Sequence, residues 1–152
     1  MHTHTWSVFK QEVSHYNPSI IAITETWLSS DIVSSYNYYN YKQFAVCRQS
    51  GQRGGGVMLL FNPSFSVFQV LPRVKPPITC DVLAVVDTAK GHCWVLVYRP
   101  PQCSAVDSEA LVECLESVLT NCKYVTICGD FNMKDIDWQS VNKQSLCPIE
   151  RN

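Results

Sequence analysis

The sequence contains no stretch of about 18 consecutive apolar residues, which is the length that a membrane-spanning helix needs. Its first twenty residues also lack the basic start and the long apolar run of a secretory leader. Eight cysteines are present, yet no two of them have the Cys-x-x-Cys spacing of structural zinc sites. These absences predict a soluble, intracellular chain without a membrane partner, whose cysteines are reduced and act as small apolar residues.

The length and composition predict one domain. The chain has 152 residues, 46% of them hydrophobic, which is enough to bury roughly 70% of the surface that the unfolded chain exposes. No internal repeat or low-complexity tract divides the sequence. We therefore treat residues 1–152 as a single domain.

The charge is unevenly distributed, although the net charge is only -1. Residues 42–99 carry seven basic and two acidic side chains, whereas residues 1–41 and 100–152 are acidic overall. A basic middle segment between acidic flanks suits a phosphate ester held near a metal ion. The alternative is an ordinary mixed surface in contact with solvent.

Apolar periodicity predicts two helices and several strands. Helical spacing of apolar residues occurs before Asn17-Pro18 and again from Asp107, a candidate N-cap, to Cys122. A four-residue linker with one glycine joins two long apolar runs, which predicts an antiparallel hairpin. The expected strands are residues 19–24, 42–48, 57–61, 65–70, 80–87, 92–98 and 124–128. Hairpins mixed with helix-strand units predict an α+β layered sandwich, with helices on the outer faces.

Two acids follow short apolar runs that each come after a predicted helix. Glu25 follows residues 20–24, and Asp130 follows residues 124–128 with Asn132 two positions later. The carboxyl ends of such strands are where α/β sheets tend to hold their reactive groups. Because Mg²⁺ needs only one or two carboxylates besides water and substrate oxygens, Glu25 and Asp130 are candidate metal-site residues. Alternatively, each is a solvated strand end or a turn.

Three further residues extend this candidate site. Tyr98 ends an apolar strand where its hydroxyl can reach the same rim, and Arg99 can pair with a phosphate. Arg53 precedes three glycines that fit neither the dinucleotide fingerprint nor the Walker loop, so this segment is either a hairpin loop or a second phosphate contact. Tyr98 can instead be packed on the two prolines that follow it. The extra acids Asp135 and Asp137 are typical of loop and cap residues.

Taken together, the order and spacing of four motifs resemble the endonuclease domain of non-LTR (LINE-type) retrotransposon polyproteins. That domain is a member of the DNase I-like endonuclease/exonuclease/phosphatase superfamily. The resemblance spans almost the whole chain. The motifs are Glu25-Thr26-Trp27-Leu28, Arg53-Gly54-Gly55-Gly56-Val57, Val97-Tyr98-Arg99-Pro100-Pro101, and Gly129-Asp130-Phe131-Asn132 followed by Asp135-Ile136-Asp137-Trp138.

The resemblance implies a DNase I-like sandwich of two mixed sheets flanked by helices, dependent on Mg²⁺ or Mn²⁺, that nicks DNA in the nucleus to prime reverse transcription. It makes Glu25 the metal ligand, Tyr98 the active-site tyrosine near the phosphate, and Asp130 the aspartate that orients or deprotonates water. Asn132 becomes the phosphate-contacting partner of Asp130. Arg99 and Arg53 are additional expected contacts to phosphate or DNA.

The sequence also departs from the family pattern. No strand with a metal-site asparagine precedes the first predicted helix, and no Ser-Asp-His motif with a catalytic histidine follows residue 138. We therefore expect an incomplete domain with impaired turnover. Two alternatives stay open: a catalytically silent remnant that binds nucleic acid or protein, and a superfamily member that acts on a phospholipid or inositol phosphate.

Overall fold

The computed structural model of the chain describes residues 3–30, 32, 33, 38, 40–48, 54–119 and 122–134. Within these residues, the chain forms two helices and seven strands, named in the order of the sequence. They are α1 (Thr3–Tyr16), β1 (Ile20–Thr24), β2 (Lys42–Val46), β3 (Val57–Phe61), β4 (Val67–Val70), β5 (Asp81–Asp87), β6 (His92–Tyr98), α2 (Ala105–Leu119) and β7 (Tyr124–Asp130).

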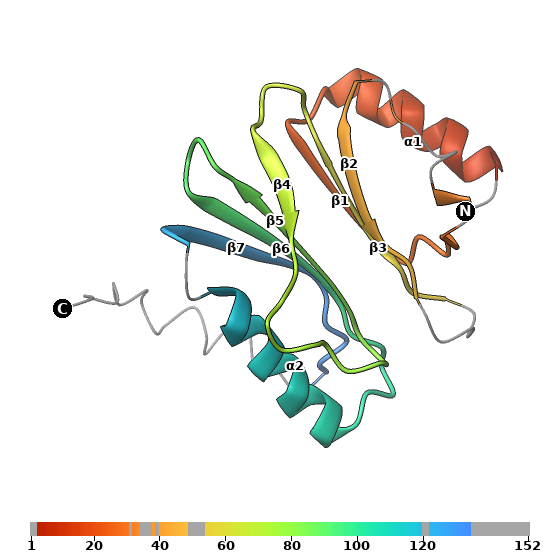
Figure 1. Cartoon of the computed structure of the whole chain (residues 1–152). Helices are drawn as coiled ribbons and strands as arrows, with labels where there is room; N and C mark the ends of the chain where they lie inside the picture. Colours follow the sequence, from red (N-terminus) through yellow and green to blue (C-terminus); the bar gives the residue numbers. More distant parts are fainter. Residues whose placement is uncertain are drawn as a thin grey trace.

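The strands form two sheets (Figure 1). One sheet has the order β1-β3-β2, and both of its pairings are antiparallel. The other has the order β4-β5-β6-β7, in which only the β6 and β7 pair is parallel. The helix α2 connects these two parallel strands, as a crossover between parallel neighbours requires.

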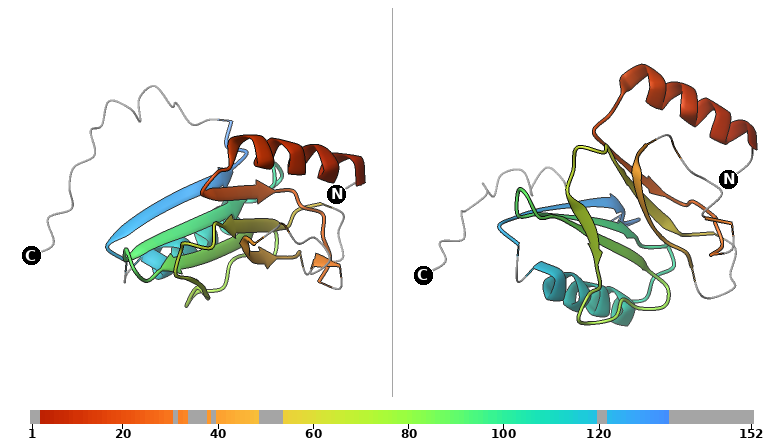
Figure 2. Two further views of the ribbon diagram at one scale, coloured as in Figure 1. Left: turned by 90° about the horizontal axis from the view of Figure 1, so that it is seen from above. Right: turned by 45° about the horizontal axis from the view of Figure 1, so that its top comes forward.

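The sheets stack on each other, and one helix covers each outer face (Figures 1 and 2). Alternation along β3 shows why. Val57, Leu59 and Phe61 point to the second sheet, whereas Met58 and Leu60 pack with Val13 of α1. Because both faces of β3 are covered, all five of its residues are buried. The α+β layered sandwich expected from the sequence is therefore confirmed.

The boundaries of several elements differ slightly from the predictions. The β5 and β6 hairpin is present as expected, and β6 has the predicted limits. Strand β7 continues two residues further than predicted, so Asp130 is its last residue. The helix α2 begins at Ala105, and its N-cap is Ser104, whose Oγ accepts a hydrogen bond of 3.0 Å from the Asp107 N–H. The prediction of Asp107 as the N-cap was therefore wrong.

The fold places three candidate residues at neighbouring strand ends and leaves β7 at the edge of its sheet. The carboxyl ends of β1, β6 and β7 bring Glu25, Tyr98 and Asp130 into one neighbourhood. Strand β7 forms one edge of its sheet among the described residues, with β6 on one side. Within the same part of the chain, neither helix has the length and apolar character to cross a membrane.

Candidate active site

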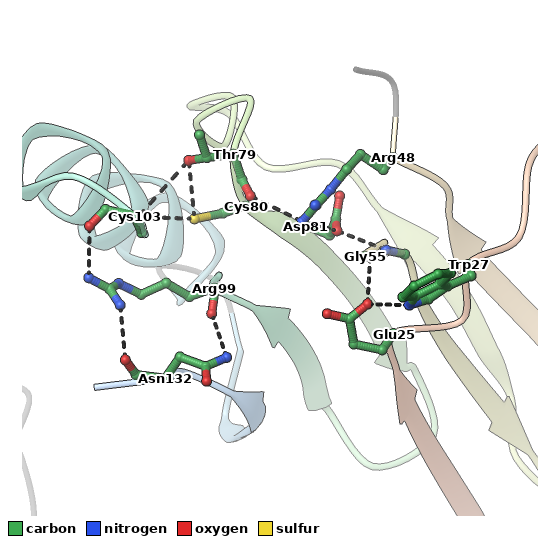
Figure 3. Close-up of polar contacts among 11 residues, drawn as sticks. Glu25, Trp27, Arg48, Gly55, Thr79, Cys80, Asp81, Arg99, Cys103 and Asn132 are labelled. Carbon is green, nitrogen blue, oxygen red and sulfur yellow. Dashed lines mark hydrogen bonds and ion pairs between the residues drawn. The ribbon is translucent and has the colours of Figure 1, made fainter. Parts of the chain in front are cut away.

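Glu25 lies directly after β1 in a left-handed backbone conformation, with φ of 54°. Its Oε2 accepts hydrogen bonds from Trp27 Nε1 at 2.5 Å and from the Gly55 N–H at 2.7 Å (Figure 3). Burial by itself would raise the pKa of Glu25, but hydrogen bonds from Tyr98, Gly55 and Trp27, together with the charge of Arg48, outweigh it and lower the pKa. The side chain is therefore an oriented, ionised carboxylate at neutral pH.

The glycine-rich segment before β3 builds the cradle of this carboxylate. Gly55 and Gly56 have positive φ angles, and a Cβ on Gly56 would lie 2.4 Å from Thr26 Oγ1. Their carbonyl groups accept hydrogen bonds from the N–H groups of Trp27 and Thr26. The segment was predicted as a hairpin loop or a phosphate contact, and its described part orients Glu25 through backbone contacts.

Tyr98 is the last residue of β6 and is buried, with 6% of its surface exposed. Burial and the negative charges of Glu25 and Asp130 raise the pKa of Tyr98 to about 12, against the opposing charge of Arg48. The Arg48 guanidinium lies over its ring, 5.1 Å from the centroid. Its phenol is thus a protonated hydrogen-bond donor that faces both predicted acids.

Asp130 reaches this position through the parallel pairing of β7 with β6, in which it is the register partner of Tyr98. Its carbonyl accepts a hydrogen bond of 2.8 Å from the Arg99 N–H. Gly129 permits the pairing, because a Cβ there would lie 1.9 Å from the Val97 carbonyl oxygen. An open cavity of about 530 Å³ borders Asp130 and is lined by residues 128–134. A substrate can therefore approach Asp130 from solvent.

Asn132 and Arg99 are joined to each other. Asn132 Nδ2 donates to the Arg99 carbonyl at 3.0 Å, and Arg99 Nη1 donates to the carbonyls of Phe131 and Asn132 at 3.2 and 3.4 Å. The other Arg99 donors contact Ser108 Oγ and the Cys103 carbonyl. In this arrangement the part-buried Arg99 braces the segment after β7, and the prediction that it contacts phosphate stays a prediction.

Four other candidates come from the sequence. Arg53, Asp135 and Asp137 fall outside the described residues. His92 is at the start of β6, at the opposite end of that strand from Tyr98, and its Nε2 is 2.8 Å from Thr126 Oγ1. No described histidine is therefore placed beside the acids.

Sequence reasoning missed a buried ion pair that supports the site. Arg48 Nη2 lies 3.4 Å from Asp81 Oδ2, and their side chains are 10% and 5% exposed. Asp81 Oδ2 also accepts a hydrogen bond of 2.9 Å from the Gly56 N–H. Burial raises the pKa of Asp81, although Gly56 and Arg48 oppose that shift. An aspartate at the start of an apolar strand and an arginine after another carry no local signal that they meet.

The donor set fits a divalent cation that takes most of its ligands from water and phosphate. Glu25 supplies one oriented carboxylate, and both Glu25 and Asp130 interact with Tyr98. In the described part of the chain, no group of three or more His, Cys, Asp or Glu side chains is arranged to enclose a metal ion.

Comparison with known proteins supplies the family. Residues 7–146 match the sequence profile described as Endonuclease/Exonuclease/phosphatase family. Among curated proteins, none matches the chain by sequence.

Solved structures share the fold at low sequence identity. The 3′ phosphatase NExo from Neisseria, bound to a product DNA hairpin, has a TM-score of 0.60 and 18% identity over 89% of this chain and 55% of its own. TDP2 from D. rerio, complexed with a single-strand DNA product, has a TM-score of 0.58 and 13% identity over 90% and 57%. The endonuclease domain of TRAS1, a telomere-specific non-LTR retrotransposon, has a TM-score of 0.54 and 18% identity over 83% and 54%. The chain thus spans little more than half of each of these structures, and the DNase I-like sandwich is confirmed.

Proposed function

The chain belongs to the endonuclease/exonuclease/phosphatase family, and from that membership we propose that it hydrolyses phosphodiester bonds in DNA with a divalent metal ion, Mg²⁺ or Mn²⁺. We propose further that the reaction is the strand nicking of a retrotransposon-type endonuclease. The motifs around Glu25, Tyr98 and Asp130 support this finer assignment. A retrotransposon-type endonuclease would act in the nucleus.

One observation carries the proposal. Tyr98 is in hydrogen-bonding contact with Glu25 and is the register partner of Asp130 in the sheet. The two acids come from chain positions more than one hundred residues apart, and each interacts with Tyr98 at the carboxyl end of its strand, one strand in each sheet. Two acids around one tyrosine, with Asp130 bordering an open cavity, are what metal-assisted attack on a phosphate requires.

Glu25 is the residue that we expect to hold the metal ion. Its hydrogen bonds from Gly55 and Trp27 fix the carboxylate and favour its charged form. A bound divalent cation would neutralise part of the phosphate charge and favour attack by water.

Asp130, Asn132 and Tyr98 are the residues that we expect at the reacting phosphate. Asp130 borders the open cavity, where its carboxylate can orient a water molecule and accept its proton. Tyr98 keeps its proton, because its pKa is about 12, and its single O–H, which now contacts Glu25, can turn to donate a hydrogen bond to a phosphoryl oxygen. Asn132 is held by the Arg99 carbonyl, and its side-chain oxygen is the remaining acceptor of that amide.

The surface charge is compatible with DNA, but the basic segment contributes less than its composition implies. Arg48 and Arg99 are engaged inside the protein. Arg73, Lys75 and Lys90 are exposed. We therefore expect these three side chains to supply the contacts to the nucleic-acid backbone.

Plasmid nicking tests the proposal. Purified chain is incubated with supercoiled plasmid, with Mg²⁺ or with a chelator, and conversion to open circles is measured. We expect slow nicking that needs the metal, because the family's catalytic histidine motif does not occur in these 152 residues. Asp130→Asn should lower the rate by about 10²- to 10⁴-fold, the usual contribution of a positioned acid-base group.

Glu113→Gln is the matched control, since it removes an equally charged carboxylate from the exposed face of α2. It should nick at the wild-type rate. Equal nicking by wild type and Asp130→Asn would show that a contaminating nuclease, or another site, is responsible.

A second function is a binding module without turnover. The observation that favours it is the edge strand β7, on which Tyr124, Val125 and Ile127 are exposed. In that case DNA retention at low salt would survive Glu25→Gln combined with Asp130→Asn, and nicking would be undetectable in all variants.

A further inference from the structure

Two cysteine side chains meet beside the active site, although neither belongs to it. Cys80 Sγ and Cys103 Sγ lie 3.7 Å apart (Figure 3). Cys80 immediately precedes β5, and Cys103 lies in the connection between β6 and α2. Since a disulfide bond is about 2.05 Å long, less than about 2 Å of approach separates these sulfurs from bonding distance.

The two thiols differ in access to solvent. Cys80 is buried, with 4% of its surface exposed, and burial raises the pKa of its thiol to about 12. Cys103 is half-buried, and its carbonyl accepts a hydrogen bond from Arg99 Nη2 at 3.3 Å. An oxidant dissolved in water therefore reaches Cys103 first.

The surroundings hold both sulfurs in place. Thr79 Oγ1 lies 3.7 Å from Cys80 Sγ and 4.0 Å from Cys103 Sγ. The same hydroxyl donates a hydrogen bond of 3.1 Å to Asp107 Oδ2 in the first turn of α2. This contact joins the segment before β5 to the start of α2 and so keeps Cys80 and Cys103 close together.

We propose that Cys103 and Cys80 form an oxidative modification site that takes hydrogen peroxide as its oxidant. The Cys103 thiolate attacks one peroxide oxygen, the O–O bond breaks, and Cys103 becomes a sulfenic acid while hydroxide leaves. Cys80 sulfur then attacks the sulfenic sulfur, the S–O bond breaks, and the thiol proton leaves with the hydroxyl group as water. The two thiols lose two electrons in total, and one peroxide becomes two water molecules.

The bond would join two supports of the active site. Asp81, next to Cys80, holds Arg48 and the Gly56 N–H. Arg99, next to Cys103 through its carbonyl contact, holds the segment after β7. Formation of the disulfide does not depend on the proposed hydrolysis. A missing cross-link would therefore leave the proposed hydrolysis intact, and missing hydrolysis would leave the disulfide proposal intact.

A second pair of cysteines offers an internal comparison. Cys93 interacts with Cys122, but Cys93 is fully buried within β6, which is hydrogen-bonded to strands on both sides. Bridging there would displace a central strand. Cys80 and Cys103 both lie in connecting segments, which adjust at lower cost.

Disulfide mapping of the whole chain tests the site. The reduced protein is treated with hydrogen peroxide, free thiols are blocked with N-ethylmaleimide, and the chain is digested without reductant by trypsin and chymotrypsin. Chymotrypsin cuts after Trp94 and Tyr98, which separates Cys93 from Cys103, and a further digestion with Glu-C after Glu109 and Glu116 separates Cys103 from Cys114 and Cys122. Mass spectrometry should find the Cys80 and Cys103 peptides linked, and dithiothreitol should release them.

Three variants sharpen the result. Cys103→Ser should abolish the cross-link, and Cys128→Ser, which changes another half-buried cysteine, should leave it intact. Cys80→Ser should leave Cys103 as a sulfenic acid that dimedone captures. An absent cross-link in folded wild-type protein, or one that joins Cys93 to Cys122 instead, would overturn the proposal.

Discussion

At the scale of single residues, the most informative feature is that the pKa values of Glu25 and Asp81 are shifted in opposite directions. The hydrogen bonds from Tyr98, Gly55 and Trp27 hold the Glu25 pKa below its ordinary value of 4.5. Burial raises the pKa of Asp81 above its ordinary value of 3.8. The surroundings of Glu25 thus favour its ionised form, which the proposed chemistry needs. The surroundings of Asp81 disfavour its ionised form.

Glu25→Gln should make the free energy of unfolding less dependent on pH. A depressed folded-state pKa contributes stability that is present above about 4.5 and is lost as the pH falls through the folded-state value. Wild type should therefore exceed Glu25→Gln in stability at pH 7, and the gap should close in acid. Urea unfolding of both proteins in a chelator measures it, and a gap that widens in acid would contradict the assignment.

Tyr98→Phe should slow nicking and shift the acid side of its pH–rate profile to higher pH. Losing one hydrogen bond to a charged group of about 1.5–3 kcal/mol lowers the rate by about 10- to 100-fold. Tyr98 also helps to lower the Glu25 pKa, so the variant should need a higher pH to keep that carboxylate charged. A pH–rate profile of both proteins checks this, and an unchanged acid limb would mean that the phenol does not act on Glu25.

Sequence patterns located the acids but not their supports. Glu25, Tyr98 and Asp130 could be predicted because each ends an apolar run at a matching position. Arg48 and Asp81 could not, because their role depends on a pairing between strands that are distant in the chain. Where the side chain of Arg99 points is set by contacts after β7, which no local pattern specifies.

At the scale of secondary structure elements, the parallel pairing of β6 and β7 depends on one glycine. Gly129 has φ of 147°, and its Cα faces the Val97 carbonyl so closely that no side chain fits. Asp130 follows directly, so the position of the predicted general base depends on this contact.

Gly129→Ala should therefore be severely destabilising, by about 3 kcal/mol or more, because backbone must move to admit the methyl group. Gly91→Ala is the matched control. It also has a positive φ, but its Cβ would meet only Lys123 Cβ at 3.5 Å, so a cost of about 1–2 kcal/mol is expected. Urea unfolding compares the two, and equal losses would disprove the steric argument.

Elements with a clear period were the ones that sequence reasoning placed well. The β5 and β6 hairpin and the limits of β6 follow from apolar alternation and a short glycine-containing turn. The ends of β7 and α2 were less accurate, because Cys128-Gly129-Asp130 pairs through backbone alone and Ser104 competes with Asp107 as a cap.

At the scale of the whole molecule, the buried pair of Arg48 and Asp81 joins the two sheets. Arg48 follows β2 in one sheet, and Asp81 begins β5 in the other. The order of strands within each sheet, such as β1 beside β3, could not be predicted from the sequence. Local sequence patterns do not specify which distant strands pair.

Arg48→Met should cost about 3–5 kcal/mol of stability at pH 7, since it leaves a buried carboxylate without its partner. The raised pKa of Asp81 means that this carboxyl contributes most stability when protonated, and that contribution is lost as the pH rises through its folded-state pKa. The cost should therefore shrink in acid. Urea unfolding at pH 7 and in acid measures this cost. The control is the double variant in which Arg48→Met is combined with Asp81→Asn. A double variant no more stable than Arg48→Met would count against the ion pair.

The strand that carries the proposed general base also forms a rim of the molecule. Among the described residues β7 is bonded on one side only, and Tyr124, Val125 and Ile127 on it are exposed. An added strand at this rim would extend hydrogen bonding along β7 as far as Asp130. If two copies of the chain pair along this edge, turnover per molecule should change on dilution, in step with light scattering.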